Sequence, residues 1–133
     1  RPPLPTHGSR THARLHPHIH AHREPDAPRV GAALTWLGEN YTLKENPGLG
    51  AQGLYYYYHT IAKSLVAAQV DKLELPGGKT VDWRRELGTL LVSTQNSDGS
   101  WINENSRWWE NDSILVTSYD VISHEQIYYS LPE

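Results

Sequence analysis

The chain has 133 residues with a formal net charge of −3, and it contains neither cysteine nor methionine. The absence of cysteine excludes disulfides, thiolate nucleophiles and zinc sites that need sulfur, and the dispersed lysines and arginines make no basic surface for nucleic acid. No apolar run approaches the roughly 20 residues of a membrane span, so we expect no transmembrane segment.

The composition divides the chain near residue 26. Residues 1–25 are rich in His, Pro and Arg, whereas residues 26–132 alternate amphipathic segments with Gly, Asn and Pro turns. We expect the second part to hold the core. Because the chain opens on Arg1 and lacks methionine, we expect it to be part of a longer protein.

Four histidines in the first part have the period of an extended strand: His16, His18, His20 and His22. This row could chelate a transition metal. No carboxylate or thiolate stands at the spacing of a closed site, however. We therefore predict no structural or catalytic metal site and no cofactor.

Two helices are predicted in the first half of the second part. Apolar residues recur at helical spacing from about 28 to 41, after Asp26 and Pro28, which suit a helix start. A second helical stripe spans residues 52–68, beyond the Gly- and Pro-containing segment 44–50.

Two further helices are predicted after a turn at residues 75–78. The first is capped by Thr80 or Asp82 and ends at Gln95. The second begins near Asp112 and ends before Pro132. Its predicted apolar stripe is Leu115, Tyr119, Ile122, Gln126 and Tyr129. Strand signals are scarce, so the fold class is all-α, and the residues expected to be mostly buried are Leu37, Leu65, Leu87, Leu91, Trp101 and Tyr119.

The segment 95–101 reads Gln-Asn-Ser-Asp-Gly-Ser-Trp between two of these helices. Gly99 permits the positive φ of a tight helix exit, and the side chains of Gln95 and Trp101 can hydrogen-bond and stack across the turn. The pattern indicates a structural tie between helices.

An internal repeat follows. Residues 37–60 match residues 91–117 in order of features: the end of a helix, a Gly-containing loop, then an apolar helix with Tyr and Thr in its first turns. A helical hairpin of this kind cannot bury its apolar face alone. We therefore expect neighbouring repeats of a parent protein as partners.

The second repeat resembles a known family. The residues that carry the likeness are Trp83-Arg-Arg-Glu-Leu87, Leu91, Gln95, Asp98-Gly-Ser-Trp101, Asn103, Arg107-Trp108, Glu110 and Leu115-Val-Thr-Ser-Tyr119. They are similar to the repeat of the squalene-hopene cyclase and prenyltransferase superfamily, the terpenoid cyclase-like proteins. The resemblance implies an α/α toroid of stacked hairpins, with residues 8–21 as a degraded upstream helix.

The resemblance also implies a parent protein that acts on or binds an isoprenoid, or another apolar ligand, as an isomerase, lyase or transferase. It carries over a helix-tying role to Gln95, Gly99 and Trp101. The chain has no DxDD run, no DDxxD run and no cysteine for zinc, so it supplies no catalytic residue, and we expect the fragment alone to be inactive. Two alternatives remain: a non-catalytic toroid that binds peptide, glycan or lipid, and a truncated reading frame without a selected activity.

Some aromatic residues are candidates for lining an apolar cavity, where ring faces stabilise a carbocation. They are Tyr55, Tyr58, His59, Trp108 and Tyr119. Packing in the core is the other interpretation for the tyrosines, and Trp108 and Trp109 either grip a sugar or lipid or cover the end of the hairpin.

Glu110 and Asp112 are the remaining acidic candidates. They could form an acid/base pair or a metal site, but acidic residues just before a helix are favoured by its dipole. Helix capping is therefore the prediction for both.

Overall fold

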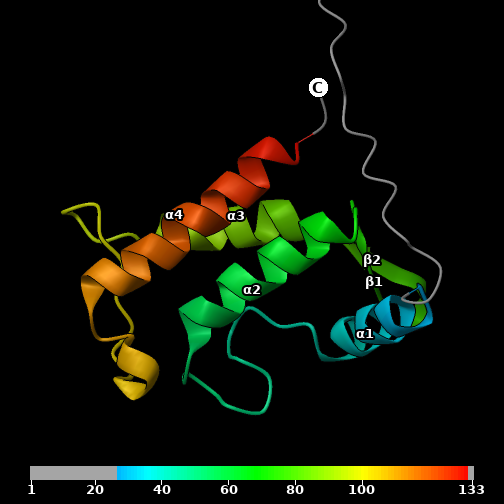
Figure 1. The fold of residues 1–133 in the computed structure, drawn as a ribbon, viewed down its shortest axis with the longest axis horizontal. Coiled ribbons are helices and arrows are strands. Elements are labelled where there is room, and N and C mark those ends of the chain that lie inside the picture. Colours follow the sequence, from blue (N-terminus) through cyan, green and yellow to red (C-terminus); the bar gives the residue numbers. More distant parts are fainter. Residues whose placement is uncertain (1–26, 132–133) are drawn as a thin grey trace, which may run out of the picture.

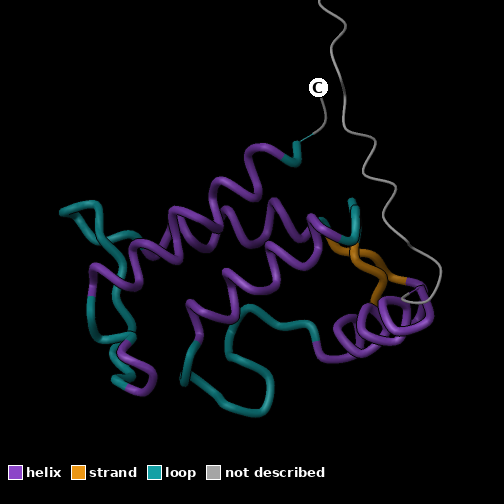
Figure 2. The backbone as a smooth tube through the Cα atoms, viewed as in Figure 1, coloured by secondary structure: helices purple, strands orange, loops and turns teal. Residues whose placement is uncertain are grey.

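The computed structural model describes residues 27–131, which are mostly helical with one short hairpin (Figures 1 and 2). The elements in chain order are α1 (Ala27–Asn40), α2 (Leu54–Ala67), β1 (Leu73–Leu75), a 3-10 turn (Pro76–Gly78), β2 (Lys79–Val81), α3 (Trp83–Thr94), a second 3-10 turn (Arg107–Trp109) and α4 (Ser113–Tyr129). The four predicted helices are confirmed. The predicted N-terminal segment lies outside the described residues.

Short polar side chains set the starts of α3 and α4. The Asp82 carboxylate accepts a hydrogen bond from the backbone N–H of Arg85, and the Asp112 carboxylate accepts one from Ile114 at 2.9 Å. These bonds satisfy N–H groups that have no partner within the helix. Asp82 is thus the cap of α3, while the other candidate, Thr80, lies in β2.

The prediction missed the β-hairpin. Residues 75–78 turn as expected, but the residues on either side pair as antiparallel strands, with Leu73 opposite Val81. Each strand has only three residues, which is too short for an alternating pattern to appear in the sequence. The side chains of Leu73 and Val81 are buried and belong to the core.

The long helices α2 and α4 lie side by side and run in the same direction (Figure 1). The rings of Tyr56, in the first turn of α2, and Tyr119, in the second turn of α4, meet edge to face with their centroids 5.7 Å apart. α3 runs antiparallel to α4. Arg84, at the start of α3, lies at the far end of α4, where its Nε donates to the Ser130 hydroxyl at 2.8 Å. α1 packs against β1, where Gly38 lies directly on the Glu74 carbonyl.

The core lies between these helices and the hairpin. Its buried apolar residues are Tyr55, Tyr58, Ile61, Ala62, Leu65, Leu73, Val81, Trp83, Leu87, Leu91, Trp101 and Val116. Four of the six residues expected to be buried are among them. Leu37 and Tyr119 pack against this core but are only half-buried.

The predicted apolar stripe on α4 is wrong, because each buried residue of this helix lies one position after a residue of the predicted stripe. The buried positions are Val116, Asp120 and Ser123, whereas Tyr129 of the predicted stripe is 80 % exposed. The sequence offers apolar side chains on more than one side of this helix, and the side that packs carries two polar residues. An apolar periodicity cannot identify such a face.

Candidate functional site

The glutamine motif forms a compact clasp at the end of α3. The Gln95 side-chain Nε2 donates to the Gly99 carbonyl at 3.0 Å, and Gly99 has a φ of 85°, which glycine adopts without steric cost. Within the turn, the backbone N–H of Asn96 donates to the Ser100 carbonyl at 2.8 Å. The clasp therefore holds the chain in a fixed exit from α3.

Trp101 joins the clasp to both neighbouring helices. Its indole Nε1 donates to the Leu91 carbonyl in the last turn of α3 at 2.7 Å, and its backbone N–H donates to the Thr117 hydroxyl of α4 at 3.1 Å. The side chain is only 6 % exposed. The geometry fits the helix-tying role that the resemblance implies for Gln95, Gly99 and Trp101.

Replacing Trp101 with phenylalanine should lower the free energy of unfolding by about 2–3 kcal/mol, because the smaller ring leaves a cavity and the Leu91 carbonyl keeps the Thr94 hydroxyl but loses the indole donor. Urea denaturation followed by circular dichroism measures this loss. Trp36→Phe is the matched control, since Trp36 is 54 % exposed on α1 and should change stability by less than about 0.5 kcal/mol. Equal effects of the two substitutions would contradict the tying role.

Tyr55 and Tyr58, two of the candidate cavity residues, are buried in the core. Their rings meet edge to face at 5.5 Å, and the Tyr58 hydroxyl donates to the Leu43 carbonyl at 2.6 Å. Burial raises the pKa of both phenols above the ordinary value. Both residues pack α2 against the loop and helices around it.

His59 and Tyr119, two more candidates, form a pair between α2 and α4. Their rings are stacked, with centroids 5.7 Å apart and an interplanar angle of 16°. The Nδ1 of His59 is buried without a hydrogen-bond partner among residues 27–131. Burial, followed by the nearby Lys63 charge, lowers the pKa of this imidazole. Four of the five candidates thus occur as two ring pairs, Tyr55 with Tyr58 and His59 with Tyr119. That they line a cavity in the complete protein stays a prediction.

Trp108, the fifth candidate, lies close to Gly53, just before the start of α2. It belongs to the 3-10 turn before α4, and its side chain is 59 % exposed.

Glu110 and Asp112 cap two different helices. Asp112 caps α4 as predicted, but Glu110 is fully buried and reaches α2, where its Oε1 accepts from the backbone N–H of Tyr56 at 2.8 Å. Its Oε2 accepts from the Asn103 side-chain amide at 2.7 Å. The expectation that Glu110 serves the helix that follows it is therefore wrong.

An acid and imidazole pair that was not predicted from the sequence lies on α4. Asp120 is fully buried, and its Oδ2 lies 3.0 Å from Nδ1 of His124, one helical turn on. Nδ1 of His124 also lies 3.1 Å from the Asp120 backbone carbonyl, and neither carboxylate oxygen has a hydrogen-bond partner in the described chain. Burial raises the pKa of Asp120 to about 6, while His124 acts in the opposite direction. The i, i+4 spacing of Asp and His was the available signal.

His124 also lines a groove of about 520 Å³ between α3 and α4. The other walls are Val92, Gln95, Trp101, Val121, Glu125, Tyr128 and Tyr129. Most of these side chains are aliphatic or aromatic. The arrangement places Asp120, a buried carboxyl group with a raised pKa, next to an imidazole at the edge of an apolar groove.

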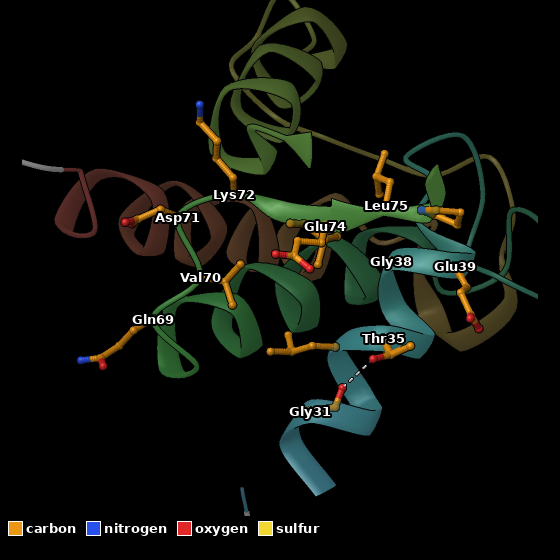
Figure 3. Close-up of a pocket in the computed structure, with 13 residues that line it drawn as sticks. Gly31, Thr35, Gly38, Glu39, Gln69, Val70, Asp71, Lys72, Glu74 and Leu75 are labelled. Carbon is orange, nitrogen blue, oxygen red and sulfur yellow. Dashed lines mark hydrogen bonds between the residues drawn. The ribbon is translucent and has the colours of Figure 1, made fainter. Parts of the chain in front are cut away.

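A larger cavity, of about 670 Å³, lies between α1 and the segment that leads from α2 into β1 (Figure 3). Leu34, Val70 and Leu73 contribute aliphatic walls, and Glu74 and Lys72 carry charges of opposite sign. This mixed lining contains no arrangement of groups suited to acid/base or nucleophilic chemistry.

Within residues 27–131, no group of three or more His, Asp or Glu side chains is placed to hold a metal ion, and the histidine row at 16–22 lies outside this range. None of the helices in that part of the chain has the length and apolar character to cross a membrane. Comparison with protein-family models, curated proteins and solved structures finds no match.

Proposed function

We propose that this chain is a section of a helical-hairpin array of the α/α-toroid type, similar to the squalene-hopene cyclase and prenyltransferase repeat, whose complete protein binds an isoprenoid. The observation that supports the proposal is the parallel, side-by-side packing of α2 and α4, each of which follows an earlier helix in the chain. Stacked repeats generate this arrangement, because each hairpin buries its apolar face on the next.

In each of the two proposed repeats, α1 with α2 and α3 with α4, hydrogen bonds hold the second helix to the loop before it. In the first, the Tyr57 and Tyr58 hydroxyls donate to the carbonyls of Thr42 and Leu43, at 3.0 and 2.6 Å. In the second, the Thr117 hydroxyl accepts from the backbone of Trp101. Two units with the same plan support a repeat, although the partner atoms differ between them.

The ligand class follows from the groove between α3 and α4. An isoprenoid is a branched apolar chain, and the groove offers Val92, Val121 and the Trp101 indole as walls. The His124 imidazole and the Glu125 carboxylate at its edge suit a polar head such as a hydroxyl. We propose binding, and no reaction, for these residues.

Titration of the full chain with farnesol, followed by ¹⁵N NMR, tests this proposal. We expect saturable shifts of the Trp101 indole N–H, and binding at least about tenfold weaker in Val121→Glu, because the substitution puts a charge in the apolar groove. Val30→Glu is the matched control: Val30 is 44 % exposed on α1 and Val121 is 49 % exposed on α4. No shift in the folded wild-type chain, or equal binding by both variants, would reject isoprenoid binding at the groove.

The second candidate function is a non-catalytic α/α-toroid module that binds peptide, glycan or lipid. It is favoured by the absence of DxDD and DDxxD runs from this sequence. A linear alkanol with the same number of carbons as farnesol separates the two: equal affinity for both ligands indicates a general lipid-binding surface, whereas preference for farnesol supports the isoprenoid.

A further inference from the structure

The loop before α4 presents two adjacent indoles to solvent. Trp108 and Trp109 are 59 % and 78 % exposed, and both have a left-handed backbone, with φ of 62° and 64°. Non-glycine residues rarely adopt this conformation, and two bulky ones in succession store strain in the loop. Since neither side chain is buried, packing of the core does not account for them.

Hydrogen bonds hold the loop in this strained form. The Asn105 side-chain oxygen accepts from the backbone N–H of Arg107 at 3.0 Å. The Trp109 backbone N–H donates to the Ser106 carbonyl at 3.2 Å, and the Trp109 carbonyl accepts from the backbone N–H of Asp112 at 2.9 Å. The indoles are therefore displayed by a fixed backbone.

The two indoles differ in how they are anchored. Trp108 lies close to Gly53, where a Cβ would approach its ring to 3.4 Å, and the Arg107 guanidinium lies over the same ring, 5.0 Å from its centroid. Trp109 is the more exposed of the two. One ring is thus fixed from several sides and the other is open to a ligand.

These indoles line a pocket of about 570 Å³. Its other walls are polar throughout: Gln52, Asn105, Ser106, Arg107 and Asn111. Amide, hydroxyl and guanidinium groups donate and accept hydrogen bonds in several directions. The absence of any aliphatic wall makes the pocket unsuitable for an acyl or isoprenoid chain.

We propose that this pocket binds a neutral glycan with equatorial hydroxyls, such as a β-linked glucose or N-acetylglucosamine chain. A pyranose of this kind has a flat C–H face that stacks on an indole, and a rim of hydroxyls that pairs with amides. This site goes beyond the proposed function and is independent of it, since it shares no residue with the groove between α3 and α4.

Isothermal titration of the full chain with cellohexaose and with chitohexaose tests the proposal. We expect saturable binding of one or both, at least about tenfold weaker in Trp109→Ala, which removes one stacking contact. Trp36→Ala is the matched control, because it removes an exposed indole from α1 and should leave the affinity unchanged. Maltohexaose, whose axial linkage breaks the flat face, should bind at least about tenfold more weakly than the better β-linked ligand.

A second variant separates binding from folding. Trp109→Gly relieves the left-handed strain, so it should raise the melting temperature while it weakens glycan binding at least about tenfold, as in Trp109→Ala. The proposal is overturned if neither β-linked hexamer binds the folded wild-type chain, or if Trp109→Ala binds as well as wild type. Trp109-dependent binding to phosphatidylcholine vesicles without glycan binding would also overturn it, in favour of a membrane anchor.

Discussion

Replacing Glu110 with alanine should lower the free energy of unfolding by about 3–5 kcal/mol, the largest effect expected of any single substitution considered for this chain. The carboxylate is fully buried and accepts from the Tyr56 backbone N–H at 2.8 Å and from the Asn103 amide at 2.7 Å. Alanine leaves both donors buried without this acceptor and opens a cavity at the start of α2. Urea denaturation followed by circular dichroism measures the loss.

Two further variants establish the cause. Glu110→Gln keeps one acceptor oxygen but sets an NH₂ group against a donor, so it should cost about 1–2 kcal/mol. Glu104→Ala removes an exposed carboxylate from the same loop and should change stability by less than about 0.5 kcal/mol. If Glu110→Ala were no more destabilising than Glu104→Ala, the capping of α2 by this residue would be refuted.

The sequence was sufficient for the helices because their signals are local. Asp82 and Asp112 cap the helices that directly follow them, and the 3.6-residue period of each segment extends over 12 to 17 residues. The clasp could also be predicted from the sequence, since Gln95, Gly99 and Trp101 lie within seven residues. A hairpin with three-residue strands gives no such signal.

The features that the sequence did not reveal depend on contacts between distant residues. Glu110 caps α2 across 54 residues of chain, and no local pattern marks a cap at that distance. The buried face of α4 contains Asp120 and Ser123, which an apolar stripe excludes by definition. The left-handed backbone at Trp108 and Trp109 was also hidden, because neither residue type favours it.

Raising the pH from about 4 to about 8 should lower the free energy of unfolding of the wild-type chain through Asp120, by about 2–3 kcal/mol. The burial of this carboxylate raises its pKa from 3.8 to about 6 in the folded state. Between these two values the folded state holds a proton that the unfolded state has released. The contribution of Asp120 to stability is therefore greatest below about pH 4, is lost as the pH rises through about 6, and is absent above it.

Asp120→Asn removes this titration and should flatten the profile. The neutral amide still lies in a buried site, and this adds a cost in stability that does not vary with pH. The quantity to compare is therefore the difference in free energy of unfolding between variant and wild type at each pH. That difference should shift in favour of the variant by about 2–3 kcal/mol from pH 4 to pH 8. Urea denaturation at intervals of one pH unit measures it.

Asp98→Asn provides a control of opposite sign. Asp98 is exposed, and its Oδ1 accepts from the Ser100 hydroxyl at 2.7 Å and from the Ser100 backbone N–H at 3.0 Å, which lowers the pKa of the carboxyl. Its contribution to stability is present above the unfolded-state pKa and is lost as the pH falls through the folded-state value, so its removal should matter at neutral rather than acidic pH. If the Asp120→Asn difference stayed constant with pH, the carboxylate would titrate alike in the folded and unfolded states, and burial next to His124 would not govern its proton.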